Sequence, residues 1–325
     1  MTDFVVYDSE AVRTLLDYEG CIHAVRTAMA QLSADTKPQP LRTIMEIAPD
    51  RHFALMPGWL PEPSAFGVKI ITAFQDSQQP GHSAHRGLVV LFDSESGKLI
   101  CVADAGEITR VRTAAASAVA TDELARSDAR KLGIFGCGTQ AASHILAVAR
   151  VRSLREVVIW GRSAERAGQL ARKMEGEIRV PVRAVADPRE AAASDIICTV
   201  TGASTPVLLG EWVKPGTHVN LVGSSHLGSV EVDHRLVVSC RYIVDNRRSA
   251  LAAAAEFLLA KDAGLIGDAH IVAEIGDVLL RRVPGRISSD QITVYKSLGH
   301  IVQDLAAAVY VHARAAGSKA YSGSC

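Results

Sequence analysis

The chain has 325 residues, of which 35 are lysine or arginine and 35 are aspartate or glutamate. This balance offers no general electrostatic attraction to nucleic acid or to an anionic membrane, so we expect neither as a partner. No segment approaches the roughly 20 apolar residues of a membrane-spanning helix, and the acidic amino-terminal stretch lacks the apolar run of a secretory signal. The length suits two modest domains or one large one.

Six cysteines are scattered singly along the chain, without the paired spacing that metal ligands show. Most of them stand beside apolar residues. We therefore interpret them as reduced side chains of a cytoplasmic protein and predict no metal site.

The first 120 residues or so predict a small α+β domain built around an antiparallel sheet. The predicted helices are Ala11–Leu16 and Tyr18–Leu32, and the predicted strands are Phe4–Tyr7, Arg42–Ile47, His52–Pro57, Ala65–Thr72, Gly87–Phe92 and Leu99–Ala103. Gln75–Arg86 is predicted to be a polar loop. Gly106–Leu124 is rich in small residues and is predicted to be a helix that connects two domains.

From Asp128 onward strands and helices alternate, which predicts an α/β fold: a parallel, doubly wound sheet of the Rossmann type. The predicted strands are Leu132–Phe135, Val157–Trp160, Val180–Val185, Ile196–Thr201, His218–Val222 and Tyr242–Val244. The predicted helices are His144–Arg150, Ser163–Met174, Pro188–Ala193, Leu208–Trp212 and Ala250–Lys261, with a long one at Val294–Ala316 that leads back toward the first domain. We divide the chain into a nucleotide-binding domain, 121–299, and a second domain of residues 1–120 with 300–325.

The most informative stretch is KLGIFGCGTQAAS, Lys131–Ser143, because it predicts a buried strand that turns tightly into a helix. Gly136, Gly138 and Ala141 occupy the three small-residue positions of a G-x-G-x-x-A dinucleotide fingerprint. The first glycine permits the turn, the second lets the backbone approach a pyrophosphate, and the alanine lets the helix pack close to its strand. A glycine turn in an unrelated α/β protein is the alternative, but a second apolar strand follows about 20 residues later, as a βαβ unit requires.

The residues after the second strand indicate which nucleotide is bound. An acidic residue there would favour NAD, whereas this strand ends in Gly161-Arg162-Ser163, with no acid before Glu165. The guanidinium of Arg162 suits the extra phosphate of NADP, and Arg166 follows about one helical turn later. We therefore predict NADPH in preference to NADH; the alternative is a solvated loop arginine. The predicted cofactor-binding residues are Gly136, Gly138, Thr139, Gln140, Ala141, Gly161, Arg162, Ser163, Arg166, Thr201, Val222 and Ser297.

Three basic residues stand among apolar or small residues outside the nucleotide-binding domain: Arg42, Lys69 and Arg112. A basic side chain in such surroundings is costly unless an anion accompanies it. The anion is either a ligand or a carboxylate of the chain, and the sequence leaves both interpretations open.

Several motifs resemble those of one family, the ornithine cyclodeaminase/mu-crystallin family, in the same order over nearly the whole chain. They are GVKIIT, RTAAASAVAT, GIFGCGTQA, DIICTVT, LVGSSHLGSVEVD and KSLGHIVQDLAAA. The resemblance implies a homodimer in which the smaller α+β domain binds substrate and dimerises beside a Rossmann domain. It also implies that Arg42, Lys69 and Arg112 surround a small imino or amino acid, with the arginines on its carboxylate, and that Met56 lines the pocket.

One position departs from the cyclodeaminase pattern. Cyclodeaminases carry an aspartate where this chain has Ser225, in Gly223-Ser224-Ser225-His226. A serine cannot supply a fixed negative charge or act readily as a base near neutral pH. The resemblance therefore favours the imine-reducing members of the family over the cyclodeaminases.

We predict an NADPH-dependent reductase of small imino acids, in particular cyclic ketimine carboxylates, with Lys69, Arg112 and Ser225 as catalytic residues. Lys69 either binds the carboxylate or a water, or feeds the proton. The alternatives are an amino-acid dehydrogenase or reductive aminase that acts on an acyclic imine, an ornithine cyclodeaminase, and a crystallin-like protein that binds NADPH without turnover. The sequence leaves open the ring size, the direction of reaction, and whether His85, His226 or His300 titrates usefully.

Overall fold

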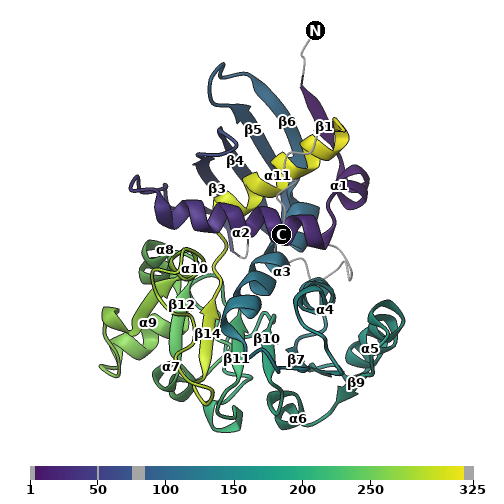
Figure 1. Ribbon diagram of the computed structural model, residues 1–325, viewed down its shortest axis with the longest axis vertical. Helices are drawn as coiled ribbons and strands as arrows, with labels where there is room; N and C mark the ends of the chain where they lie inside the picture. Colours follow the sequence, from purple (N-terminus) through teal and green to yellow (C-terminus); the bar gives the residue numbers. More distant parts are fainter. Residues whose placement is uncertain (1–3, 50, 75–84, 318–325) are drawn as a thin grey trace. The chain divides into compact units, whose positions relative to one another are not determined.

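The computed structural model describes residues 4–49, 51–74 and 85–317, and it separates into two compact units (Figure 1). The first unit comprises the described residues up to Thr113 and those from His300 onward, and the second runs from Ala114 to Gly299. Helix α3 (Ala105–Leu124) begins in the first unit and ends in the second. Within the described ranges, no helix is long and apolar enough to cross a membrane.

The first unit is built on a six-stranded sheet with the order β1-β6-β5-β4-β3-β2. Its strands are β1 (Val5–Tyr7), β2 (Thr43–Ala48), β3 (Arg51–Leu60), β4 (Ala65–Phe74), β5 (His85–Asp93) and β6 (Leu99–Asp104). Neighbours pair antiparallel, as predicted, except that β1 joins β6 in parallel. Of the predicted loop Gln75–Arg86, residues 75–84 lie outside the described ranges, whereas His85 and Arg86 begin β5.

Helices α2 (Tyr18–Ala34) and α11 (Ile301–Ala315) lie against one face of this sheet, and α1 (Ser9–Leu15) contacts the edge strand β1 and its neighbour β6 (Figure 1). The strand register places Met56, Lys69, Val89 and Ala103 in one row across β3 to β6. All four side chains are buried. The fold therefore inserts one lysine into an otherwise apolar layer.

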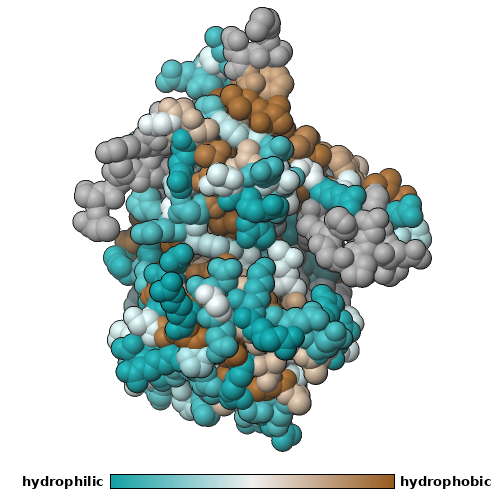
Figure 2. Space-filling view, turned by 90° about the vertical axis from the view of Figure 1, so that its right-hand side faces the viewer, coloured by the Kyte–Doolittle hydropathy of each residue, from teal (hydrophilic) through white to brown (hydrophobic). Residues whose placement is uncertain are grey.

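The opposite face of the sheet is apolar and accessible to solvent. The neighbouring row of the register consists of Pro57, Val68, Val90 and Val102, all only partly buried. On the same face the rings of Phe66 and Phe92 stack with centroids 5.2 Å apart, although Phe66 is 40% exposed. Figure 2 shows hydrophobic, brown surface over the unit that holds strands β1 to β6.

The second unit holds eight parallel strands in the order β13-β12-β14-β11-β10-β7-β8-β9. The strands are β7 (Lys131–Phe135), β8 (Glu156–Trp160), β9 (Val182–Val185), β10 (Ile196–Thr199), β11 (His218–Leu221), β12 (Arg241–Val244), β13 (Ile271–Glu274) and β14 (Thr293–Lys296). The helices are α4 (Thr139–Val151), α5 (Ala164–Ile178), α6 (Pro188–Ala192), α7 (His234–Ser239), α8 (Arg247–Ala253), α9 (Ala255–Asp262) and α10 (Ile275–Leu279).

Two hydrophobic cores cover the two faces of the parallel sheet. Adjacent side chains of β7 lie in different cores. Ile134 packs with residues of α4 and α5, whereas Phe135 packs with residues of α6, α7 and α9. This arrangement confirms the predicted Rossmann-type, doubly wound fold with a smaller α+β unit. The strand order reverses between β7 and β10, and ligands of such sheets bind at the carboxyl ends of the strands at this switch point.

The long helix predicted at Val294–Ala316 is wrong. Its first part is β14, which pairs with β11 and β12, and α11 begins only at Ile301. Gly299, with a φ of +81°, lies in the turn between them. Apolar residues run through both elements, so periodicity alone did not separate a buried strand from a buried helix.

Two further predicted helices are corrected. The helix at Ala250–Lys261 is two helices, α8 and α9, interrupted at Ala254, whose ψ of 90° is extended. Leu208–Trp212 contains only a single 3-10 turn, because Leu208 pairs with Val232 in a β-bridge. Strand β13 and helices α7 and α10 are absent from the prediction.

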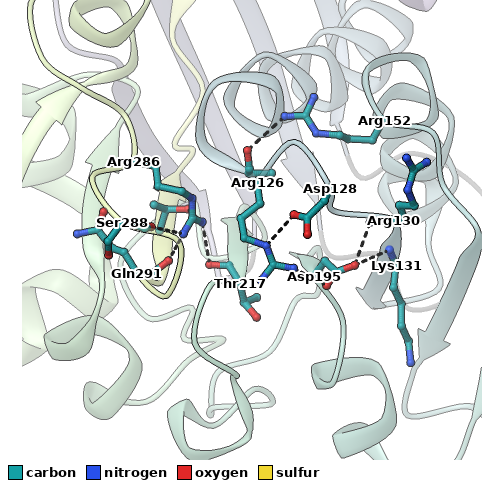
Figure 3. Close-up of polar contacts among 12 residues, drawn as sticks. Arg126, Asp128, Arg130, Lys131, Arg152, Asp195, Thr217, Arg286, Ser288 and Gln291 are labelled. Carbon is teal, nitrogen blue, oxygen red and sulfur yellow. Dashed lines mark hydrogen bonds and ion pairs between the residues drawn. The ribbon is translucent and has the colours of Figure 1, made fainter.

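The amino-terminal edge of the parallel sheet is held by paired charges (Figure 3). Asp195, just before β10, accepts hydrogen bonds from the backbone N–H groups of Arg130 and Lys131 and pairs with Arg126 at 3.2 Å. Arg286 donates to backbone carbonyls of the loops around it. A shallow hollow of about 690 Å³ lies beside Arg126 and Arg286. Because both guanidinium groups are engaged within the chain, the carboxyl-terminal edge is the better candidate for a ligand site.

Candidate functional site

The predicted phosphate turn lies between β7 and α4, at the switch point. Gly136 has a φ of +124°, and a Cβ atom there would lie 2.8 Å from the carbonyl oxygen of Val200, so only glycine fits without strain. Gly138 is the N-cap residue of α4 and offers no side-chain cap, which leaves the first N–H groups of the helix to an anion. The other residues predicted for this turn are Thr139, Gln140 and the buried Ala141.

A buried hydrogen-bonded pair anchors α4 beneath this turn. His144 Nδ1 lies 2.7 Å from the carbonyl oxygen of Gln140, so Nδ1 is the donor and Nε2 accepts from the Ser117 hydroxyl at 3.0 Å. Burial lowers the pKa of His144 to about 4. The imidazole is therefore neutral near neutral pH, and it links α4 to α3 without placing a charge under the turn.

The residues predicted to bind the adenosine end follow β8. Gly161 packs so close to Cys137 that a Cβ there would lie 3.1 Å from Sγ. Ser163 caps α5, accepting a hydrogen bond from the N–H of Arg166 at 3.2 Å. The side chains of Arg162 and Arg166 are exposed, as binding of a phosphate from solvent requires.

The remaining predicted cofactor residues all stand where a central strand ends. Thr201 follows β10, Val222 follows β11 and Ser297 follows β14, and these three strands are neighbours. Ser225 lies half-buried three residues beyond Val222. Ser297 Oγ is buried, and among the described residues it has no hydrogen-bond partner. A buried hydroxyl without a partner is a place for a ligand atom or a water.

This part of the second unit fits a dinucleotide. The carboxyl edge of the sheet carries four features in the order that a Rossmann site requires. They are a turn that only glycine fits, a helix N-terminus without a side-chain cap, exposed arginines after β8, and a buried hydroxyl at a strand end that has no partner among the described residues. The pyrophosphate would lie on Gly138 and α4.

The first unit brings together the predicted basic residues around a carboxylate. Lys69 Nζ and Arg112 Nε both lie 2.9 Å from the same oxygen, Oδ1 of Asp304. Arg112 Nη1 also donates to Gln303 Oε1 at 2.8 Å. The side chains of Lys69, Arg112 and Asp304 are 2%, 6% and 0% exposed, so these three residues form a buried cluster with one net positive charge.

The surroundings of Lys69 lower its pKa to about 8, chiefly because burial disfavours the ammonium, with further contributions from Arg112 and Arg42; Asp304 opposes the shift. Arg42 is half-buried, and its place beside a substrate stays a prediction. A pKa near 8 keeps Lys69 mostly protonated at neutral pH yet able to release its proton, which suits acid–base chemistry.

Met56 lies beside Lys69, as its register partner on the covered face of the sheet. His300 caps α11 and is buried, and its pKa is lowered to about 4 by burial, so it is neutral near neutral pH. His226 is exposed, with Nδ1 2.9 Å from the hydroxyl of Ser229. The side chain of His85 lies outside the described residues.

Sequence reasoning missed several buried polar and charged residues in both units. Asp304 and Gln303 escaped notice although they stand in an otherwise apolar helix, IVQDLAAAVYV, where a lone carboxylate needs a cation. Glu231, Glu256 and Lys296, all fully buried in the second unit, carry the same signal of a charge within an apolar run.

Fold and site together define an oxidoreductase that uses a nicotinamide nucleotide. The sequence profile of the ornithine cyclodeaminase/mu-crystallin family matches residues 3–319. The chain belongs to this family, which confirms the resemblance.

Three known proteins illustrate the similarity. Ketimine reductase mu-crystallin of Mus musculus is 37% identical over 276 residues, which cover 84% of each chain. The structure of Thermococcus litoralis Delta(1)-pyrroline-2-carboxylate reductase in complex with NADH and L-proline has a TM-score of 0.92 at 28% identity, with 96% of this chain and 98% of that chain covered. An archaeal alanine dehydrogenase dimer with bound NAD has a TM-score of 0.90 at 27% identity, with 97% and 96% covered.

Proposed function

We propose that the protein is an NADPH-dependent reductase of small imino acids, with cyclic ketimine carboxylates such as 1-pyrroline-2-carboxylate or 1-piperideine-2-carboxylate as substrates. The products would be L-proline or L-pipecolate. The observation that carries this proposal is the buried cluster in which Lys69 and Arg112 share one carboxylate oxygen of Asp304. Its excess positive charge suits an anionic substrate, and similarity over most of the chain to a ketimine reductase and a pyrroline-2-carboxylate reductase supports the reaction.

In this reaction the C=N bond gains a hydride at carbon and a proton at nitrogen. A bound nicotinamide supplies the hydride. Arg112, helped by Arg42, holds the substrate carboxylate, and Lys69 holds at Nζ the proton that the nitrogen receives. Asp304 keeps Lys69 and Arg112 in place and opposes the loss of the Lys69 proton. Ser225 positions the substrate nitrogen or the nicotinamide amide.

The preference for NADPH rests on Arg162, Ser163 and Arg166. The side chains of Arg162 and Arg166 are exposed, and the hydroxyl of Ser163 accepts the backbone N–H of Arg166. No acid stands between the end of β8 and Glu165 to repel the 2′-phosphate. The Thermococcus enzyme was solved with NADH, so cofactor preference in this family has to be measured for each member.

A second candidate is amino-acid dehydrogenation, or reductive amination of an open-chain 2-oxo acid. It is favoured by the similarity to the archaeal alanine dehydrogenase. It uses the same hydride step, and it would show ammonia- or amine-dependent oxidation of NADPH with a 2-oxo acid.

The proposed assembly is a homodimer that covers the exposed apolar face of the six-stranded sheet. Val68, Phe66 and their neighbours on that face would leave water on association, which is favourable by roughly 25 cal/mol per Å² of apolar surface. The similar alanine dehydrogenase is described as a dimer, which supports a second copy of this chain as the partner.

The test of the proposed chemistry is Lys69→Met, with Lys98→Met as the matched control. Lys98 is exposed between β5 and β6, so the control makes the same change at a solvated site. We expect Lys69→Met to lose at least 100-fold in turnover of the ketimines while the dissociation constant for NADPH changes less than threefold. Turnover that survives in Lys69→Met would exclude this role for Lys69.

A further inference from the structure

Glu231 is a fully buried residue whose carboxyl group receives five hydrogen bonds, four from the loops after β10 and β11 and one from the end of β10. From the loop after β10 it accepts the backbone N–H of Thr201 at 2.6 Å and the Thr201 hydroxyl at 2.8 Å. From the loop after β11 it accepts the N–H groups of Gly223 at 2.7 Å and Ser224 at 3.2 Å. The hydroxyl of Thr199, the last residue of β10, donates at 2.8 Å.

A second buried carboxylate, Glu256, extends this network to β14. Glu256 accepts the backbone N–H of Glu231 at 3.0 Å and pairs with Lys296 Nζ at 3.0 Å. Lys296 Nζ also donates to the backbone oxygen of Ser224 at 2.5 Å and to its hydroxyl at 2.6 Å. The ends of three neighbouring strands, β10, β11 and β14, are thus joined by two carboxylates and one ammonium.

The donors and acceptors of the network balance. The three protons of Lys296 reach three acceptors, so Lys296 and Glu256 form a satisfied pair. Each of the five groups bound to Glu231 can donate a proton to it. Burial raises the pKa of Glu231, and the hydrogen bonds from Thr201 and Thr199 and the charge of Lys296 oppose this shift. Five donors around two oxygens favour the ionised form, and a carboxylate pulls the two loops together more strongly than a neutral side chain would.

Gly223 shows how closely the loops approach. A Cβ at this residue would lie 2.5 Å from Glu231 Oε1 and 2.1 Å from the backbone oxygen of Thr201. Only a glycine backbone lets the loop after β11 reach the loop after β10. The close approach and the carboxylate therefore act together.

We infer that Glu231 is a positioning residue that sets the loops after β10 and β11 for the nicotinamide half of the cofactor. The fingerprint and Arg162 belong to the β7–β8 half of the sheet, whereas Thr201, Val222 and Ser225 belong to the half that Glu231 ties. The inference rests on the proposed function only in that a nicotinamide nucleotide binds at this edge.

The test compares two ligands on Glu231→Gln, which has nearly the same shape but replaces one acceptor oxygen by a donor. The ligands are NADPH and 2′-phospho-ADP-ribose, which lacks the nicotinamide. We expect the dissociation constant for NADPH to rise at least tenfold and that for 2′-phospho-ADP-ribose to change less than twofold. NADH and ADP-ribose, measured in parallel, give the same comparison if the chain prefers NADH.

The control is His218→Gln, at the amino end of β11, where a buried imidazole bonds Thr293. His218 is as buried as Glu231 but lies at the opposite end of the strands. We therefore expect His218→Gln to lower the melting temperature without changing the dissociation constant of one ligand more than that of the other. Should Glu231→Gln fail to fold, Thr199→Val removes a single bond to Glu231 and is expected to shift NADPH binding about threefold with 2′-phospho-ADP-ribose unchanged. The inference is overturned if Glu231→Gln weakens the binding of both ligands equally, or the binding of neither. The binding measurements contain no imine, so a failure of the proposed reaction would leave their result intact.

Discussion

Asp304→Asn removes the one carboxylate that Lys69 and Arg112 share in the first unit. Both cations bind the same oxygen at 2.9 Å, and their side chains are 2% and 6% exposed. Loss of one partner of a buried ion pair costs about 3–5 kcal/mol, because it leaves uncompensated charge away from water. We therefore expect Asp304→Asn to lower the free energy of unfolding by about 3–5 kcal/mol at pH 7.

Asp17→Asn is the matched control, since it makes the same change in an exposed ion pair. Asp17 pairs with Arg314 of α11, and the two side chains are 44% and 45% exposed. Asn also preserves the N-cap that Asp17 gives to α2. The exposed pair contributes roughly 0–1 kcal/mol.

The assay is urea denaturation followed by circular dichroism, at pH 7 and at pH 9.5. Asp304 attracts the Lys69 proton, so its removal lowers the pKa of Lys69 below about 8. At pH 9.5 Lys69 is mostly neutral in the folded variant, and the cost of the substitution should be smaller than at pH 7. A loss no larger than that of Asp17→Asn at pH 7 would refute the view that the buried cluster depends on Asp304.

Four other predictions follow from the same geometry. Gly136→Ala should lower the free energy of unfolding by about 1–3 kcal/mol, because alanine is strained at a φ of +124°, and should abolish measurable NADPH binding in a fluorescence titration. Arg162→Ala should weaken NADPH binding about 10- to 100-fold and leave NADH within twofold, while Arg172→Ala, at an exposed site of α5, should change neither. Val68→Asp should convert a dimer to a monomer in sedimentation velocity, since it places a charge on the apolar face. In a pH–rate profile, kcat/KM for ketimine reduction should fall above about pH 8, because Lys69 loses the proton that the reaction needs. Between about pH 8 and 10.5 the unfolded chain binds more protons at Lys69 than the folded chain does, because the lysine pKa in the unfolded chain is near 10.5. The free energy of unfolding should therefore rise with pH in this range, relative to that of Lys69→Met.

The sequence predicted those features that depend on neighbouring residues. The fingerprint turn at Gly136 and most strands of the parallel sheet could be predicted because a strand, a glycine turn and a helix follow one another within a short stretch. The residues after β8, which predict the choice of nucleotide, also lie within one short stretch of sequence. Lys69 and Arg112 were singled out because a charge in an apolar run is conspicuous wherever it stands.

What the sequence did not predict depends on distant partners. Lys69 and Asp304 are 235 positions apart, so no local pattern connects them. The sequence of β14 predicts the start of a helix, whereas its identity as a strand depends on pairing with β11 and β12. The network of Glu231, Glu256 and Lys296 joins the ends of three strands, and a spacing pattern within any one segment could not reveal it.

The most direct test of the proposed function is the oxidation of NADPH and NADH by the purified protein with 1-pyrroline-2-carboxylate and 1-piperideine-2-carboxylate, with L-ornithine plus NAD as a parallel assay for ammonia release. We expect ketimine-dependent oxidation that is faster with NADPH, and no ammonia from ornithine, since Ser225 lacks the charge of the cyclodeaminase aspartate. Ammonia release from ornithine without ketimine reduction would contradict the account, because another residue would then have to supply that charge.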